Sequence, residues 1–176
     1  MISTLKLARR DQARLWLGEL PSELAFVAKA QVERAIASGS TVSAWTSVAL
    51  EVLLPRGPMA FYGALGVRFE PLPAGMIQLR VSSSDEGKPA ASTLAGRLDE
   101  VRTGLPSEFV PSVLGGLSAG AHLVGLGPGT LGIGHAAAGA AGSNSWVFER
   151  LGRAAAVLLA APDGTDWQRT LAELFE

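Results

Sequence analysis

The 176-residue chain contains no cysteine, and this absence removes several classes of function at once. Without a thiol there is no disulfide framework, no thiol nucleophile and no zinc–thiolate site. His122 and His135 are the only histidines, so a histidine-rich metal centre is not expected either. The sequence therefore predicts no metal site, and no motif in it identifies a catalytic residue.

Charge of one sign and long apolar runs are also lacking. The net charge is -1 with a pI near 6.1, and lysine is scarce, which does not indicate a strongly basic nucleic-acid binder. The longest apolar stretch, 110–142, is interrupted throughout by glycine and proline, unlike the run of about 20 residues in a membrane helix. Lys6, Arg9 and Arg10 argue against an N-terminal signal segment. We expect a cytoplasmic protein with no membrane partner.

The first third of the chain shows two kinds of apolar periodicity. Alternation predicts strands over 2–7, 13–20 and 41–54. Between them, apolar residues at helical spacing predict a helix over 22–36, with Ser22 as its N-cap. The Pro- and Gly-rich segment 55–58 reads as a linker.

The rest of the chain continues with strands and stronger helices. Alternating apolar residues predict a strand from Phe61 to Phe69, and a shorter one follows over 76–81. A helix is expected to begin at Pro106. Another, over 145–161, has Ser143 or Asn144 as its N-cap, and a short helix over 166–175 ends the chain. The segment 93–103 fits either helix or strand.

A pentapeptide is repeated 85 positions apart. Leu105–Phe109, LPSEF, reproduces Leu20–Leu24, LPSEL, and each copy precedes an expected helix. We interpret this as an internal duplication with two modules. The first, 1–57, is strand-strand-helix-strand, and the second, 58–176, ends in the C-terminal helices.

Two segments of the second module carry a family resemblance. The strand matches at Phe61, Tyr62, Gly66, Val67, Arg68, Phe69, Glu70, Pro71, Leu72, Pro73 and Gly75, and the helix start matches at Pro106, Glu108, Phe109, Val110, Pro111, Ser112, Val113, Gly116 and Leu117. They resemble domain IV of the translational GTPases, of the type in elongation factor G and the tetracycline-resistance ribosomal protection proteins. The resemblance implies an α+β fold of modules similar to ribosomal protein S5 domain 2, with helices on one face of a sheet. It also implies the order strand, strand, helix, strand, helix from Phe61 onward, and a phenylalanine in the last helix, which Phe148 matches.

The same resemblance implies a non-enzymatic binding module that associates with the ribosome or RNA. In that family, loops at the tip of domain IV reach the decoding site, and the matching loops here are 55–60 and 135–145. The candidate binding residues are therefore Arg56, His135, Ser143, Asn144 and Ser145. No P-loop is present, so we expect neither GTPase activity nor a nucleotide cofactor.

Two alternatives remain open. The near-neutral charge and the Ala- and Gly-rich tip favour a protein-interaction or assembly module that has lost RNA binding. A small-molecule enzyme using the Gly-rich segment 125–145 is the other alternative, since a helix N-terminus after such a loop attracts phosphate. Within it, 127–132 is formally G-x-G-x-x-G but lacks a βαβ context, so a flexible loop or a glycine-rich strand is favoured. Asp99 with Glu100, and the cluster Arg9, Arg10 and Arg14, are interpreted as solvated surface.

Overall fold

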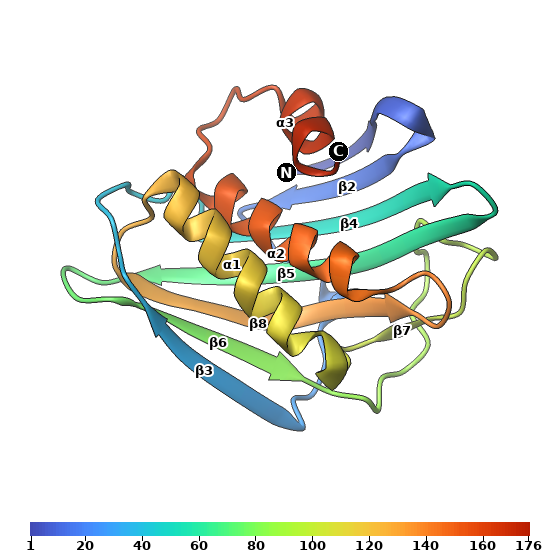
Figure 1. Cartoon of the computed structure of the whole chain (residues 1–176), viewed down its shortest axis with the longest axis horizontal. Coiled ribbons are helices and arrows are strands. Elements are labelled where there is room, and N and C mark those ends of the chain that lie inside the picture. The colour runs from blue at the N-terminus through green and yellow to red at the C-terminus, as the bar shows by residue number, and fades with distance from the viewer.

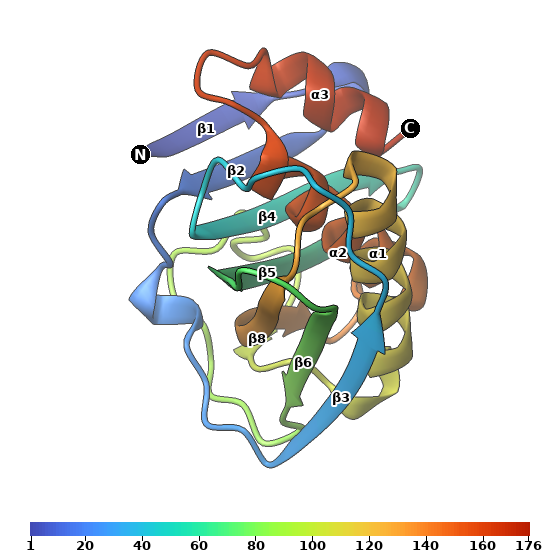
Figure 2. The ribbon, with the colours of Figure 1, turned by 90° about the vertical axis from the view of Figure 1, so that its left-hand side faces the viewer.

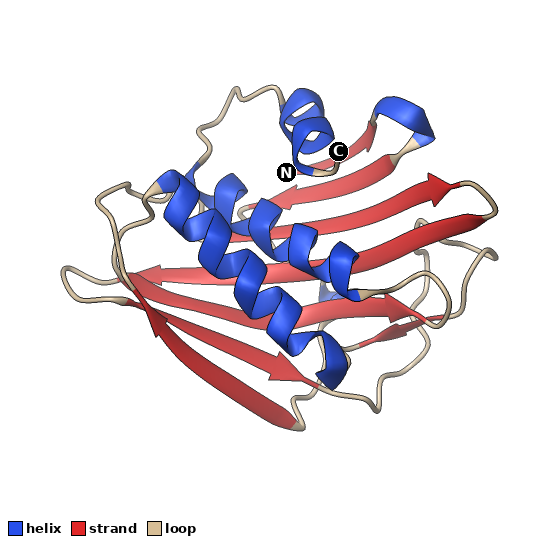
Figure 3. Ribbon diagram, in the orientation of Figure 1, coloured by secondary structure: helices blue, strands red, loops and turns tan.

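The computed structural model describes residues 1–176 as one mixed sheet with helices on one of its faces (Figures 1 and 3). The eight-stranded sheet has the order β1-β2-β4-β5-β8-β6-β3. Strand β7 also pairs with β8, at residues 137–139, past the end of the β6 pairing at 129–133. All neighbours are antiparallel except β6 and β8, which are parallel. The strands are β1 Ile2–Lys6, β2 Gln12–Leu17, β3 Ala30–Ile36, β4 Ser47–Arg56, β5 Met59–Pro71, β6 Ile77–Ser83, β7 Val101–Thr103 and β8 Gly129–Gly139. The α+β class expected from the sequence is confirmed.

Three helices follow in the second half of the chain: α1 Val110–Val124, α2 Ser145–Ala160 and α3 Trp167–Leu174. Helices α1 and α2 lie side by side over the centre of the sheet, and α3 lies near β1 and β2 (Figures 1 and 2). None of the three has the length and apolar character that crossing a bilayer requires.

The main core fills the space between the sheet and these helices. It contains 35 buried residues, to which β4 and β5 contribute alternate side chains such as Leu50, Leu65 and Val67. The two long helices approach closely because small residues line their contact. A Cβ on Gly116 would lie 2.1 Å from the carbonyl oxygen of Glu149. Gly116 and Gly120 of α1 are thus explained by packing, whereas Gly115 faces open space.

The opposite face of the sheet is covered by loops and not by helices (Figure 2). Residues 18–29, which we call the strap, run across this face from β2 to β3, and the loop 84–100 covers its far part. Glu51, with 2% exposure, fastens that loop: it accepts hydrogen bonds from the Tyr62 hydroxyl at 2.9 Å and the Leu94 N–H at 2.8 Å. Arg14 pairs with the same carboxylate at 3.1 Å, so the buried charge is compensated.

The helix predicted over 22–36 is wrong. A single 3₁₀ turn, Ser22–Leu24, is followed by extended backbone and then by β3, an edge strand paired with β6. Val32 and Ile36 lie opposite Val81 and Ile77, so these apolar residues share the apolar face of the neighbouring strand, with Arg34 between them opposite Leu79. Pairing with an existing sheet overrides a helical pattern that had no second helix to pack against.

The order of elements in the two halves therefore differs. The first 57 residues supply β1, β2 and β4 at one side of the sheet and β3 at the opposite edge, and the boundary at 57 falls in the β4–β5 hairpin. The matching helices on which the duplication was based are not both present. The other predicted strands and helices are confirmed to within a few residues except that 41–46 precedes β4, and 93–103 consists of turns followed by the short β7.

Candidate functional site

Arg56 is the one charged residue of the first predicted tip loop, and it is not free. It lies at the end of β4, where its two Nη groups donate to Asp11 at 2.6 and 3.0 Å. The hydrogen bonds with Asp11 raise the pKa of the Arg56 guanidinium, against the smaller opposing effect of burial. The pair neutralises the only cation that the sequence placed in this loop.

The second predicted tip loop is a tight turn between β8 and α2. The N–H groups of Ala141 and Gly142 donate to the Asp99 carboxylate at 3.0 and 2.7 Å. Ser143 Oγ donates to the Tyr62 carbonyl at 2.7 Å and accepts from the Gly139 N–H at 2.8 Å. The carboxylate of Asp99, from the loop 84–100, therefore occupies N–H groups that an incoming phosphate would need.

Asn144 is the N-cap of α2, as the sequence predicts. Its Oδ1 accepts from the Val147 N–H at 3.0 Å, and Ser145 is the first residue of the helix. Asn144 and Ser145 thus have a structural explanation in the start of α2.

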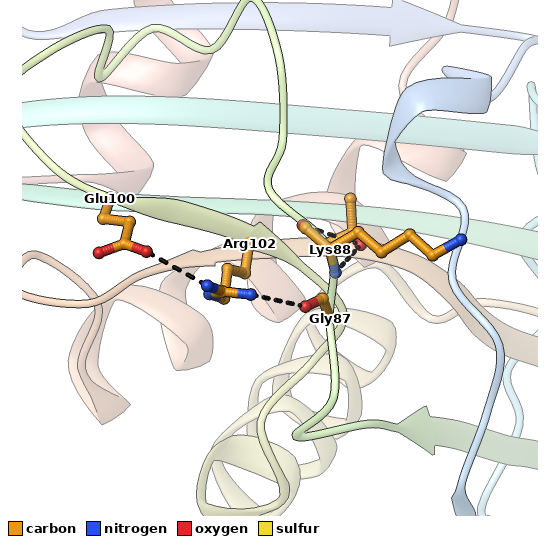
Figure 4. Close-up of polar contacts among 5 residues, drawn as sticks. Gly87, Lys88, Glu100 and Arg102 are labelled. Atoms are coloured by element: carbon orange, nitrogen blue, oxygen red, sulfur yellow. Dashed lines mark hydrogen bonds and ion pairs between the residues drawn. The ribbon is translucent and has the colours of Figure 1, made fainter.

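A hollow of about 280 Å³ lies beside this turn, and its charged lining is mainly acidic. Asp85, Glu100 and Glu108 face it with Arg102, which donates to Glu100 at 3.3 Å and to the Gly87 carbonyl at 3.1 Å (Figure 4). Three carboxylates against one guanidinium repel a phosphate group.

The acids of this hollow are partly engaged by the chain itself. Asp85 accepts from the Ser107 N–H at 2.9 Å and from its hydroxyl at 2.8 Å, and these bonds lower the pKa of the Asp85 carboxyl. Figure 4 shows the Lys88 side chain directed away from Arg102, so it adds no positive charge beside that residue. Sequence reasoning assigned Ser143 to this region, and the structure places Ser143 in the lining of the hollow.

His135 is in the middle of β8 and not in the tip loop where the sequence placed it. It lies opposite Gly66 on β5, whereas Arg56 lies opposite Met59, seven residues away along the same strand. At about 3.3 Å per residue this separation is about 23 Å, so the two predicted site residues are not brought together. Burial, and then the positive charge of Arg68, lower the pKa of the His135 imidazole and favour its neutral form.

A second hollow, of about 320 Å³, contains His135. It lies on the face of the sheet opposite the helices, which we call the open face, and we call it the strap hollow because Leu20 of the strap borders it. It is lined by Leu20, Gln31, Arg68, Glu70, Arg80, Thr130, Gly132, Ile133, Gly134 and His135. Its two arginines come from neighbouring positions of β5 and β6 on either side of β8. Its lining contains two guanidinium groups and one carboxylate.

Arg68 and Arg80 were not identified as site residues from the sequence. The available signal was the period of two in β5, where Arg68 and Glu70 alternate with buried Val67 and Phe69 and so share the open face. The glycines of the G-x-G-x-x-G segment belong to β8 from Gly129 onward, which confirms the glycine-rich strand and excludes the flexible loop.

The remaining candidates are dispersed over the molecule. His122 is exposed on α1, and Arg9 and Arg10 are exposed in the β1–β2 turn, while Arg14 is held by Glu51. Nowhere do three or more His, Asp or Glu side chains gather as a metal ion would require. Comparison of the chain with models of known protein families and with curated protein sequences gives no match.

Proposed function

We propose that this chain is a non-enzymatic binding module of the translation-factor domain IV type and that its partner is the ribosome or another RNA. The observation that carries the proposal is the succession β5, β6, α1, β8 and α2, in which the parallel strands β6 and β8 are connected through α1. This order from Phe61 onward is the one that the resemblance implies, apart from the short β7 and the added α3. This support is a likeness of fold, and a fold alone does not determine a function. The binding chemistry has to come from the side chains of the site.

Core positions support the same proposal. The family carries a buried phenylalanine in its last helix, and Phe148 of α2 is fully buried here. Its ring stacks on Phe109, a residue of the matched helix start, at 4.9 Å between ring centroids. Two residues that the resemblance selected in separate motifs therefore contact each other.

The tip of the domain contributes little to this proposed binding. Arg56 is bound to Asp11, and the hollow beside Ser143 is acidic. We propose that RNA contact is made by the open face of the sheet and that Arg56 stabilises the β4–β5 hairpin.

Co-sedimentation with purified ribosomes at low and moderate salt tests the proposal. We expect binding that weakens as salt increases, because each phosphate contact releases counterions. Arg56→Gln, with the Asp11 partner retained, is expected to lower stability more than binding. A wild-type protein that stays in the supernatant at low salt would remove ribosome binding from consideration.

A protein partner is the second candidate, and the edge strand β3 favours it. This strand pairs only with β6, and six of its seven residues are exposed. An unpaired strand edge can add a strand from another chain. Co-purification before and after nuclease treatment separates the candidates: a protein partner is retained after RNA is digested, whereas an RNA-dependent one is lost.

A further inference from the structure

We infer that the strap hollow binds a phosphodiester group of RNA between the side chains of Arg68 and Arg80. The inference makes two claims, one about the polymer and one about the chemical group that is bound. That the polymer is RNA rests on the proposed function, whereas the binding of a phosphodiester group rests on the geometry of the hollow.

The two arginines flank one glycine in a row across three strands. Arg68 of β5 and Arg80 of β6 both lie directly opposite Gly132 of β8. Both are on the open face, because Val67 and Leu79 beside them are fully buried on the other. With strands about 4.8 Å apart, their Cα atoms are separated by about 10 Å, and both side chains can reach a group above Gly132.

The surface of β8 between the two arginines carries glycines at 132 and 134, and packing does not require glycine at either position. We call this surface the floor of the hollow. A Cβ on Gly132 would have its nearest neighbour, the Arg80 carbonyl oxygen, at 3.9 Å, and a Cβ on Gly134 would meet nothing within 4 Å. In the same strand, a Cβ on Gly129 would lie 2.5 Å from the Glu70 carbonyl oxygen. Neither Gly132 nor Gly134 has a positive φ. Packing and backbone conformation therefore require glycine at 129 but not at 132 or 134, where its effect is to leave the floor bare.

Arg68 has no partner within the chain. None of the ion pairs or side-chain hydrogen bonds includes its guanidinium. Arg80 pairs with Glu33 at 3.3 Å through Nε, which leaves its Nη groups available. An anion above Gly132 would receive donors from both sides.

The charge and shape of the lining select a phosphodiester. Arg68 and Arg80 contribute two positive charges and Glu70 one negative charge, while Glu33 outside the lining pairs with Arg80, so the guanidinium without a partner is that of Arg68. A phosphodiester carries a single negative charge on a tetrahedral centre whose oxygens can accept from two separate guanidinium groups. A planar carboxylate matches the fork of a single arginine, whereas the two charged oxygens of a tetrahedral phosphodiester diverge toward separate donors.

A second hollow on the other side of Arg68, lined also by Glu19, gives a longer ligand room to extend. It has a volume of about 430 Å³ and shares Leu20, Arg68 and Glu70 with the strap hollow. The two hollows therefore meet at Arg68, so a chain that extended from one hollow into the other would pass its guanidinium.

Fluorescence anisotropy with a labelled uridine octamer tests the inference. Arg68→Gln is expected to weaken binding about tenfold, as for a lost charge-assisted bidentate contact. The slope of log K against log salt should fall by about 0.7, the value for one phosphate of a single strand. Arg97→Gln removes the same charge from an exposed position of the covering loop and is expected to leave both quantities unchanged. An octamer with neutral methylphosphonate linkages should not bind.

Gly132→Val fills the floor without changing any charge. Valine suits a strand, so the variant is expected to fold, which thermal unfolding verifies, and to bind the octamer at least about tenfold more weakly. In proton spectra of the wild-type protein, the octamer should shift the ring signals of His135 and leave those of exposed His122 in place.

Several results would overturn the inference. They are wild-type affinity in Arg68→Gln, wild-type affinity in a folded Gly132→Val, and no octamer binding by the wild-type protein at low salt. Equally tight binding of uridine monophosphate would assign the hollow to a small phosphate monoester. Octamer binding that depends on Arg68 without ribosome co-sedimentation would retain this inference and reject the ribosome as partner.

Discussion

The pentapeptides Leu20–Leu24 and Leu105–Phe109 fold alike and then diverge. In each, the proline is extended, the next three residues form a 3₁₀ turn, and the last apolar side chain is buried. The backbone bonds also match: the Leu24 N–H donates to the Pro21 carbonyl at 3.1 Å, and that of Phe109 to the Pro106 carbonyl at 3.0 Å. After the turn, Ala25 is extended with ψ 139°, whereas Val110 is helical with ψ -46°.

The partners of the two turns explain the divergence. The second turn is held by Asp85, and the residues that follow it have an apolar stripe that α2 covers. After the first turn, Ala25 forms a bridge with His135, and the Phe26 N–H donates to the Gly134 carbonyl at 3.4 Å. A short sequence thus determines a turn, and the neighbouring surface decides whether helix or strand continues from it.

Removing the ring beneath the second turn should have the largest effect. Phe148→Ala is expected to lower the free energy of unfolding by about 3–5 kcal/mol, because it removes a fully buried ring stacked on Phe109. Urea denaturation measures the loss. Val42→Ala, at a side chain with 84% exposure, is the control and should change stability by less than about 0.5 kcal/mol.

Truncating the equivalent buried residue of the first turn should lower the free energy of unfolding by less. Leu24 is buried in the smaller cluster, under loops that can close over a lost side chain. Leu24→Ala is expected to cost about 2 kcal/mol, the low end of the range for such substitutions. If urea denaturation shows a loss as large as that of Phe148→Ala, the two buried residues are equivalent and the contrast between the regions fails.

The carboxylate that holds only the second turn offers a finer test. Asp85→Ala should cost about 0.5–1 kcal/mol, as for a lost cap at an exposed site, and should increase amide exchange at Ser107 but not at Ser22. Because the pKa of Asp85 is lowered in the folded protein, its contribution is present above the ordinary value of 3.8. It is lost as pH falls through the lowered pKa, and equal wild-type and variant stabilities at neutral pH would contradict it.

The smallest effect is expected at His135, with which Ala25, just after the first turn, forms a β-bridge. Its pKa is lowered from 6.5, first by burial and then by Arg68, so the unfolded chain binds the proton more readily. Wild-type stability should therefore fall as pH drops below about 6.5 and level off below the lowered pKa. Urea midpoints at about pH 7.5 and about pH 5.5 should differ less in His135→Gln. An unchanged difference would show that His135 is not the titrating group.

Much of the second half could be predicted because its signals are local. The Asn144 side chain caps α2 by accepting from the N–H of Val147, three residues later. The apolar stripe of that helix is fully buried, including Val147, Leu151 and Leu158. Strand β5 follows its alternation of apolar and polar residues, and Pro71 is its last residue. In these segments propensity, periodicity and capping all agree.

The candidate site was predictable only in part, because its residues meet across strands. Arg68 and Arg80 are 12 positions apart in the sequence, and β8, which separates them in the sheet, comes later in the chain. Arg56 was assigned to a free tip, yet Asp11 on a distant turn binds it. No local pattern reports such pairings, since they depend on sheet order and register.

The sequence by itself determined the turns, the caps and the strong amphipathic elements, because each depends on residues within a few positions of one another. Tertiary structure decided the conformation of 25–36, which became strap and edge strand because β6 and β8 offered unpaired backbone groups there. It also decided that Asp99 fills the turn before α2, and that the bare floor at Gly132 lies between two arginines. Long-range pairing brings these groups together, and with them the chemistry of the open face.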